Sequence, residues 1–436
     1  MPHKITIVGG GSSTFTPALM KLFAGSRVLS GSAITLMDIS EHRLDVMSRL
    51  CKLLVKKTRA ELEIRATTDR RAALAGADFV ITSIAAGGFD AWEHDIEIPA
   101  KYGIFMTTAD TIGPGGIMRA FRHIPALVAV CRDLGEVSPN AWVFNYTNPA
   151  SANVFAMRKA GAPKVVSLCS GTVLPRRGGW GMGGFGPDEV MLPAPAAGIN
   201  HCAAVTELKL KDGRDAFPAV RERLDYPVTK WILDTYGILP YPASHWVEFY
   251  PALCRLEEPY QGRAQGLKMK YGTVHIMDHE RERAAKWEQL VQQWAGGEGE
   301  DASLDALPES EGIEVVDIIE SLIENRGETF VVNVPNHGAI PNLPDHAIVE
   351  VSSTVNAYGI HPIHAGPLPE PIAAHMRQHI AVEELTAEAA LTGSRGLALE
   401  AFLEDLHVQA HLLPEEAEKL MDEMLAAHVR WTPAFT

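Results

Sequence analysis

The sequence has few cysteines, and they are widely spaced. Five are scattered along 436 residues. An odd number at such spacing does not fit the paired framework of a disulfide-stabilised secreted protein, so we expect reduced thiols. One or more of them is then available as a ligand. The five positions are Cys51, Cys131, Cys169, Cys202 and Cys254.

Long apolar runs and an excess of positive charge are also missing. No apolar stretch approaches the roughly 20 residues that span a bilayer. The chain starts directly with a strand-like run, which does not resemble a secretion signal, so we expect a cytoplasmic protein without membrane partners. Lys and Arg number 39 against 54 Asp and Glu, a net charge of -15 that argues against a nucleic-acid surface. A few arginines in a pocket can still bind a small anion.

Apolar, β-branched segments alternate with helical patterns in the first half of the chain. This alternation predicts a right-handed parallel sheet of the Rossmann-like α/β class. Several of the segments end in polar residues, and the carboxyl edge of a parallel sheet is where ligands bind. The predicted strands are residues 4–8, 33–37, 79–84, 142–144 and 164–168.

The pattern changes after about residue 195. Longer segments with many prolines and tryptophans follow, and a long helical stretch is predicted over 370–429. We therefore expect a dinucleotide-binding domain at 1–195. A second, mixed α+β lobe at 196–436 would bind substrate and metal and support oligomerisation.

A glycine-rich turn follows the first predicted strand. Backbone N–H groups of such a turn can approach a pyrophosphate closely at the start of a helix. Asp38, after the second strand, can accept the ribose hydroxyls and favours NAD over NADP. Thr14 stands where the third glycine of G-x-G-x-x-G belongs, so a merely tight turn is the alternative. The turn consists of Gly9, Gly10, Gly11, Ser12, Ser13 and Thr14.

Two further groups follow strand ends. Asn145 and Asn148 carry carboxamides that can hold sugar or nicotinamide-ribose hydroxyls, or can simply form an Asn-Pro turn. Cys169 and His201 can hold a divalent metal, although such a pair more often lies in a core.

The glycine-bearing segment 110–117 precedes an amphipathic helix. Its glycines could let the backbone approach a ligand, or could simply build the start of the helix. Arg119 and Arg122 lie one turn apart on this helix, and we expect them on a solvated face.

Several motifs in order resemble glycoside hydrolase family 4. They are KITIVGGGSSTFTP, DTIGPGGIMRAFRHIP, NYTNPA, LCSGT, AGINH and NVPNHGAIPNLPDHAIVEV, followed by the helical stretch from HAGPLPEP onward. The resemblance spans nearly the whole chain. It implies an NAD- and metal-dependent glycosidase related in fold to malate and lactate dehydrogenases, an exception to two-carboxylate glycosidase chemistry.

The resemblance also implies a mechanism and site residues. NAD oxidises sugar C3, the metal assists removal of the C2 proton, the aglycone leaves C1, and water addition and re-reduction complete the cycle. Cys169 and His201 resemble the ligands of a metal, usually manganese, and Asn148 resembles a substrate contact. The general base of relatives is commonly a tyrosine, for which Tyr250 is our first candidate and Tyr241 our second.

The remaining expectations concern the substrate. His245 is expected to contact it. Ser170 stands where relatives carry His, Asn or Asp after the ligand cysteine, and serine is a poor general acid. Glu93 replaces an arginine of many relatives and argues against a 6-phosphoglycoside. Arg176 and Arg177 motivate an anionic hexoside, a uronide or sulfoquinovoside, against a neutral α-galactoside or α-glucoside; a solvated basic loop is the alternative.

Two other functions share the dinucleotide fold. An NAD-dependent 2-hydroxyacid dehydrogenase would produce NADH without a metal, and a catalytically inactive NAD-binding regulator would turn nothing over. The metal-ligand pair and the long second lobe favour the glycosidase. By analogy with the family we expect a homodimer or homotetramer.

Overall fold

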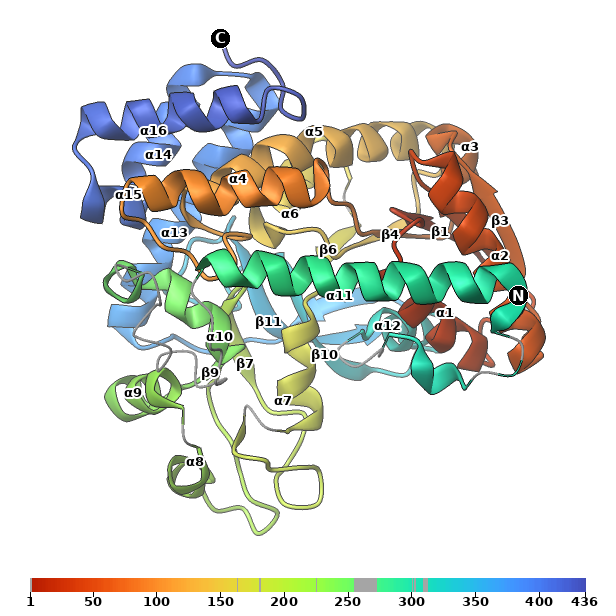
Figure 1. The fold of residues 1–436 in the computed structure, drawn as a ribbon. Helices are drawn as coiled ribbons and strands as arrows, with labels where there is room; N and C mark the ends of the chain where they lie inside the picture. The colour runs from red at the N-terminus through yellow and green to blue at the C-terminus, as the bar shows by residue number, and fades with distance from the viewer. Residues whose placement is uncertain are drawn as a thin grey trace.

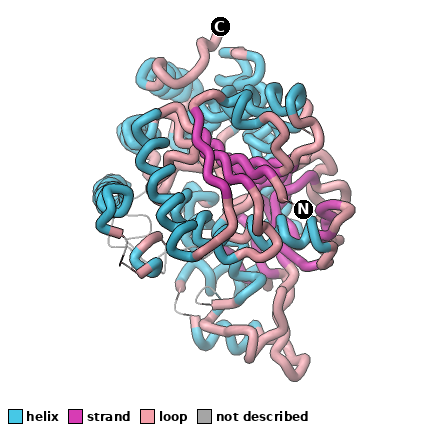
Figure 2. Tube along the Cα trace, turned by 90° about the vertical axis from the view of Figure 1, so that its right-hand side faces the viewer, coloured by secondary structure: helices cyan, strands magenta, loops and turns pink. Residues whose placement is uncertain are grey.

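The computed structural model describes residues 2–162, 164–179, 182–224, 226–254, 273–299, 301, 303–308 and 313–436. Its twelve described strands form one sheet, in the order β3-β2-β1-β4-β5-β6-β10-β11-β7-β8-β9, with β12 paired to β11. Figure 1 shows helices above and below this sheet, and Figure 2, turned by 90°, shows the strands enclosed among them.

The first six strands are all parallel. Their order, 3-2-1-4-5-6, is the order of the doubly wound dinucleotide-binding fold, so the predicted Rossmann-like class is confirmed. Buried apolar residues fill β1, β2 and β4, which is why these strands were readable in the sequence. The strands are β1 (Lys4–Val8), β2 (Ala33–Met37), β3 (Glu63–Thr67), β4 (Phe79–Thr82), β5 (Trp142–Asn145) and β6 (Val165–Ser167).

Strand β3 was absent from the sequence prediction. It pairs only with β2 along the path of the sheet, so it forms an edge. Glu63 and Ala66 are exposed, and Arg65 forms an ion pair with Glu63 at 2.7 Å. A strand with charged residues at an exposed edge lacks the apolar run on which the prediction depended.

The second half extends the same sheet with antiparallel strands. Asn333 of β10 pairs with Ser167 of β6, and β10 pairs along its length with β11. The mixed α+β character predicted for this half is confirmed. Its strands are β7 (Ala196–Ile199), β8 (Cys202–Val205), β9 (Leu239–Tyr241), β10 (Glu328–Pro335), β11 (Ile348–Asn356) and β12 (Gly359–Pro362).

Helices cover both faces of the sheet. Helices α1 and α2 pack on one another, whereas α5 packs against α3, α4, α6 and α13. Figure 1 shows α5 above the strands and α1 below them. The helices before residue 370 are α1 (Phe15–Gly25), α2 (Glu41–Thr58), α3 (Arg70–Leu74), α4 (Gly88–Lys101), α5 (Gly113–Val137), α6 (Ala150–Lys159), α7 (Val173–Arg177), α8 (Phe217–Arg223), α9 (Pro227–Tyr236), α10 (Ala243–Trp246), α11 (Thr273–Gln293) and α12 (Val315–Glu324).

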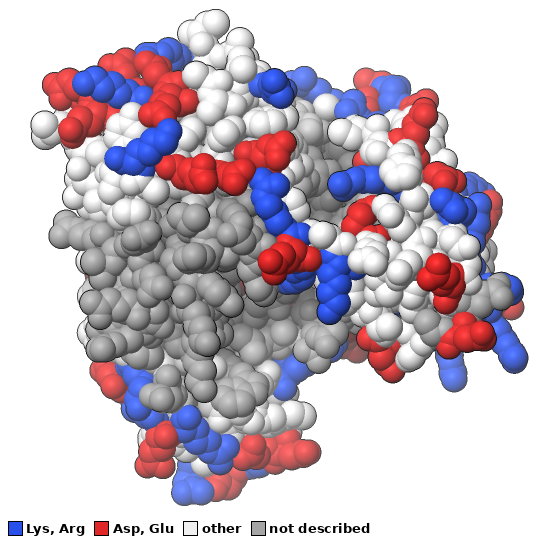
Figure 3. Space-filling view, viewed as in Figure 1, with Lys and Arg blue, Asp and Glu red and all other residues white. Residues whose placement is uncertain are grey.

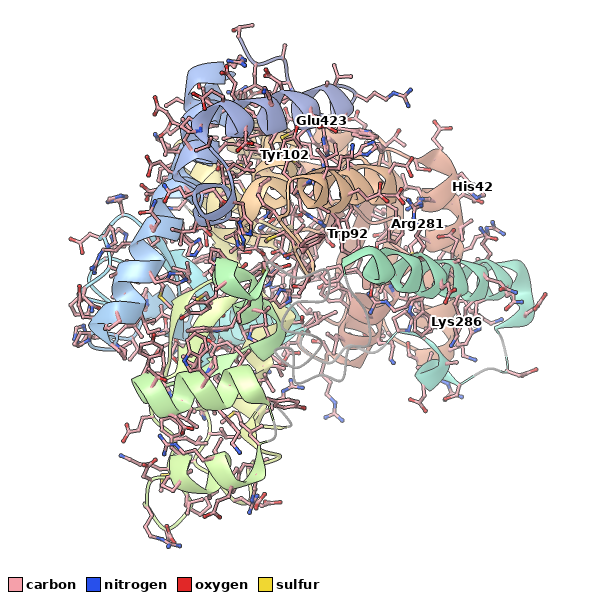
Figure 4. All side chains as sticks on the ribbon, turned by 60° about the vertical axis from the view of Figure 1, so that its left-hand side comes forward. His42, Trp92, Tyr102, Arg281, Lys286 and Glu423 are labelled. Carbon is pink, nitrogen blue, oxygen red and sulfur yellow. The ribbon has the colours of Figure 1, made fainter. Side chains whose placement is uncertain are left out.

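The C-terminal helical stretch is divided into four helices. Gly393 ends the first in the left-handed region at φ 72°, and the side chains of Ser394 and Asp405 cap the next two by accepting backbone N–H bonds. The helices are α13 (Glu370–Thr392), α14 (Arg395–Glu404), α15 (Leu406–His411) and α16 (Pro414–Ala427). Tyr102, at the end of α4, donates to Glu423 of α16, and both are labelled in Figure 4.

One apolar cluster joins the two halves, since it contains both Ile5 of β1 and Met424 of α16. Arg122 of α5 lies inside this packing and forms a bidentate ion pair with Asp95 of α4, the two side chains being 1% and 0% exposed. The expectation that Arg119 and Arg122 lie on a solvated helix face is therefore wrong, since the Nε and Nη1 atoms of Arg119 are buried as well. Packing of α4 and α13 on α5 covers that face.

The surface shows no segregation of charge on the face seen in Figure 3, where acidic and basic side chains of described residues are interspersed. All five cysteines are unpaired, as predicted. Among the described residues, no helix is both long enough and apolar enough to cross a bilayer.

The Arg122–Asp95 pair generates a stability prediction. Asp95→Asn leaves a buried guanidinium without its counter-charge, which should lower the free energy of unfolding by about 3–5 kcal/mol. Urea titration followed by circular dichroism measures this. Asp45→Asn, which removes an exposed partner of Arg49, serves as the control and should cost less than about 1 kcal/mol. Equal effects of the two substitutions would show that the buried pair has no special weight.

Candidate functional site

A cavity of about 600 Å³ opens at the carboxyl edge of the parallel strands. The segments that line it follow β1, β4, β5 and β6, the edge where the sequence analysis expected ligands. The turn between β7 and β8, the residues after β9 and Ile313, just before α12, complete it. We call it the central cavity; its lining is Thr14, Phe15, Ala18, Ser83, Asp110, Tyr146, Asn148, Leu168, Cys169, Ser170, Gly171, Leu174, His201, Pro242, His245 and Ile313.

The glycine turn lies against two neighbouring strand ends. Gly9 has φ 92°, and a Cβ there would lie 2.0 Å from the backbone oxygen of Ser83. The N–H of Gly11 donates to the Asp38 carboxylate at 3.0 Å, and a Cβ on Gly11 would meet that carboxylate at 2.8 Å. The turn is thus tight for internal reasons, and it also brings Thr14 and the start of α1 to the cavity.

The other predicted cofactor residues divide into two sets. The Ser12 hydroxyl accepts the N–H of Phe15 and so caps the turn from within, whereas the Ser13 hydroxyl bonds to no described residue. Asn145 is fully buried, and its carboxamide bonds with Thr82, Thr147 and Ser167. The contacts of Asn145 therefore shape the end of β5, below the cavity.

Three potential metal ligands converge on the cavity. Ligand atoms of Asp110, His201 and His245 all lie within 4.8 Å of one another. The rings of His201 and His245 stack with centroids 4.0 Å apart. Thr111 Oγ1 lies 2.7 Å from His201 Nδ1, which fixes the orientation of that ring. An oxygen and two imidazoles form a donor set that suits divalent first-row metals.

Charge within this cluster is strongly coupled. Burial alone would lower the pKa of His201, but the neighbouring Cys169 and Asp110 raise it well above its usual value. The pKa of Asp110 lies well below its usual value because the hydrogen bond and charge of His201 outweigh the effect of burial. Burial and the adjacent His201 lower the pKa of His245 to about 3. Positive charge at His201 is thus stabilised by its neighbours.

The backbone at two of these positions is unusual. His201 has φ 65°, and Ala109, directly before Asp110, has φ 54°. Non-glycine residues seldom adopt the left-handed region, and such residues cluster at functional sites. The surrounding structure also holds the Asp110 side chain in place, because its carboxylate accepts a hydrogen bond from Asn148 Nδ2 at 2.8 Å.

Six of the seventeen site residues predicted from the sequence line the central cavity, one of them being Thr14 of the glycine turn. Asn148, Cys169, Ser170, His201 and His245 all line it. The Cys169 thiol accepts the N–H of Gly171 at 3.3 Å and neighbours His201.

Neither tyrosine proposed as the general base lines the cavity. Tyr241 is 1% exposed, and burial together with Glu350 raises its pKa well above the usual value. Tyr250 stacks on His375 with centroids 4.7 Å apart, and burial raises its pKa. The assignment of the general base to Tyr250 or Tyr241 therefore stays a prediction.

The two arginines suggested for an anionic substrate are occupied by carboxylates. Arg176 pairs with Glu314 at 3.0 Å, with Asp317 at 2.8 Å and with Glu328 at 3.1 Å. Arg177 pairs with Asp317 at 3.2 Å, and neither arginine lines the cavity. The structure therefore places both in a network with α12 and β10.

Glu93 also has a partner. Arg281, labelled in Figure 4, reaches from α11 to the Glu93 carboxylate of α4 at 2.8 Å.

Sequence reasoning missed the loop that carries Asp110. Glu248, 1% exposed, accepts hydrogen bonds from the Thr107 hydroxyl and from the backbone N–H groups of Thr108 and Ala109. His407 of α15 bonds in turn to the Glu248 carbonyl. The one signal in the sequence was an acid at the head of the glycine-bearing segment 110–117.

Comparison with known proteins gives two family matches. The model described as "Family 4 glycosyl hydrolase" matches residues 4–175, and that of its C-terminal domain matches 196–408. An α-galactosidase of Bacillus subtilis (strain 168) is 31% identical over 99% of both chains. An α-galacturonidase of the same organism is 29% identical over 97% of this chain and 96% of its own. A 6-phospho-α-glucosidase from gut microorganisms, solved with NAD and Mn²⁺, shares the fold with a TM-score of 0.83 at 22% identity over 100% of both chains.

His407 generates a prediction about pH. Burial lowers its pKa from 6.5 to about 4, so between these values the unfolded chain binds a proton that the folded chain does not. Stability therefore falls as pH drops from 6.5 to 4, by roughly 3 kcal/mol from this group. In His407→Gln, urea titrations across this range should show a shallower fall. His346→Gln, which changes an exposed histidine, should keep the wild-type slope; a steep slope in both variants would contradict the assignment.

Proposed function

The chain belongs to the family 4 glycosyl hydrolases, and on this premise we propose that it hydrolyses hexosides with NAD and a divalent metal, manganese first, as cofactors. Its substrates would be α-galactosides or α-glucosides, or hexosides with an anionic group. The observation that carries the proposal is the convergence of the glycine turn and the Asp110–His201–His245 cluster on one cavity.

Support for NAD comes from the turn and the acid beside it. A side chain at Gly9 or Gly11 would collide with Ser83 or Asp38, so only glycine fits these positions of the turn. At the start of α1, backbone N–H groups of such a turn would bind a pyrophosphate. Asp38 would accept the adenosine ribose hydroxyls. When bound, NAD supplies an acceptor for the hydride of sugar C3. The related 6-phospho-α-glucosidase was solved with NAD and Mn²⁺.

Support for a metal comes from the donor set. Asp110, His201 and His245 would hold the ion, with Cys169 as a further ligand beside His201. When bound, the ion supplies a Lewis acid that makes the C2 proton of an oxidised sugar easier to remove.

The remaining roles fall to residues of the chain itself. Asn148 donates its amide to Asp110, and no described residue donates to its Oδ1, which leaves this oxygen to accept a sugar hydroxyl. Thr111 keeps the His201 ring in its orientation through the contact at Nδ1. Ser170 lines the cavity, where its hydroxyl would contact the substrate or an ordered water.

The proposal is tested with a panel of 4-nitrophenyl glycosides. The panel contains α- and β-glucosides, galactosides, glucuronides and galacturonides and a sulfoquinovoside, each assayed with and without NAD and Mn²⁺. We expect nitrophenol release that requires both additions and no accumulation of NADH, because the hydride returns in each cycle. NADH formation from 2-hydroxy acids, with no glycoside cleaved, would instead indicate a dehydrogenase.

The metal site is tested separately from activity. His201→Ala should weaken Mn²⁺ binding at least roughly 100-fold, since loss of a ligand exceeds loss of a residue that only supports one. Electron paramagnetic resonance of free Mn²⁺ measures this, and Cys169→Ser tests the thiol in the same way. His346→Ala removes an exposed histidine and should leave binding unchanged. Unaltered affinity in His201→Ala would exclude the proposed ligand set.

A further inference from the structure

A glutamate is buried in the middle of the sheet, between the strands that lead to two of the proposed metal ligands. Glu350 belongs to β11, and its backbone pairs with Asn333 of β10 on one side and with Gly198 of β7 on the other. The residue is 0% exposed. A carboxylate at such a position is costly unless hydrogen bonds compensate it, so the groups that donate to it matter.

Two carboxamides donate to the same oxygen of Glu350. Asn200 Nδ2 lies 3.0 Å from Oε2, and Asn333 Nδ2 lies 2.9 Å from it. The other oxygen, Oε1, has no hydrogen-bond partner in the described part of the chain. Both asparagines are 0% exposed, so water does not compete for these contacts. A single atom of Glu350 therefore joins side chains from two different segments.

The first of these segments carries His201. Asn200 directly precedes it in the turn between β7 and β8, and His201 has the left-handed φ of 65°. A non-glycine residue keeps this conformation only where its surroundings enforce it. The hydrogen bond from Asn200 to Glu350 fixes the residue before this position, and it thereby restrains the direction in which the imidazole leaves the turn.

The second segment carries Cys169. Asn333 pairs with Ser167 in the sheet, and its Nδ2 also lies 3.4 Å from the Ser167 carbonyl. Ser167 is the last residue of β6, two positions before Cys169. The contact between Asn333 and Glu350 thus connects the end of β6 to β11, the strand that also pairs with β7.

We propose that Glu350 is a positioning residue that holds Cys169 and His201 at the spacing at which they bind a divalent ion. It acts through Asn200 and Asn333 and does not itself line the central cavity. The inference rests on the metal site of the proposed function. The rival explanation is a purely electrostatic effect of the Glu350 carboxylate on the nearby His201.

The test measures binding of Mn²⁺ by electron paramagnetic resonance, without turnover. Glu350→Ala removes the shared acceptor and should weaken Mn²⁺ binding roughly 10–100-fold, as loss of a residue that supports metal ligands does. Glu350→Gln keeps an acceptor oxygen without the charge and should bind Mn²⁺ more tightly than Glu350→Ala. Equal losses in the two variants would show that the charge acts and would overturn the inference.

The link to His201 is tested from its other end. Asn200→Ala should also weaken Mn²⁺ binding, and it keeps the inference testable if Glu350→Ala does not fold. Because both substitutions break one contact, the fold-change in the double variant should be smaller than the product of the two single fold-changes. Unchanged affinity in Asn200→Ala, or effects that multiply fully, would overturn the inference.

Asn336→Ala is the matched control for a general loss of packing. Asn336 directly follows β10 and is 0% exposed, and its carboxamide donates to the carbonyls of Ile340, Leu343 and Pro344, none of which lines the cavity. This substitution should lower the temperature of unfolding and leave Mn²⁺ affinity unchanged. A loss of affinity equal to that of Glu350→Ala would overturn the inference.

NAD binding, measured by calorimetry, gives a second readout. It should keep its wild-type affinity in Glu350→Ala, because the glycine turn follows β1 and takes no part in these contacts; a parallel loss would overturn the inference. If wild type binds Mn²⁺ and cleaves glycosides but Glu350→Ala binds Mn²⁺ equally well, the inference fails alone. If the expected affinity losses occur but no glycoside is cleaved, the proposed function fails alone. If wild type binds no Mn²⁺, both fail.

Discussion

The arrangement of the site depends on one buried carboxylate outside the cavity lining. Glu248 accepts three hydrogen bonds from residues 107–109, and this contact sets the path of the chain into Asp110. Burial and the charge of Asp110 raise the pKa of Glu248, while the three donors oppose that rise. The loop and the carboxylate therefore stabilise each other, because neither satisfies its polar groups without the other.

The elements that could be predicted from the sequence are those whose cause is local. A buried parallel strand needs a short apolar run, which β1, β2 and β4 possess. The glycine turn is recognisable in the sequence because the close approach of Ser83 excludes any side chain at Gly9. His201, His245 and Asn148 were also identified as separate residues, although nothing in the sequence showed that they meet.

The elements that could not be predicted depend on partners far along the chain. Asp110 becomes part of a possible metal site only because folding brings His201 to it, and the loop before Asp110 is held by Glu248. Arg176 has no neighbouring acid in the sequence, yet folding brings α12 and β10 to it, so a basic pair that suggested a ligand is neutralised internally. Arg119 is the opposite case, because its Nε and Nη1 atoms are buried and no described residue accepts a hydrogen bond from them.

The unbroken sheet has a consequence for how substrates enter. Backbone hydrogen bonds connect β5 to β6, β6 to β10 and β10 to β11. The strands below the glycine turn and those leading to His201 therefore belong to one continuous sheet. A hinge motion between the two halves would have to break the pairing of β6 with β10 at Ser167 and Asn333. Entry and release of a sugar are therefore expected to proceed by local rearrangement of loops at the rim, with the floor of the cavity kept rigid.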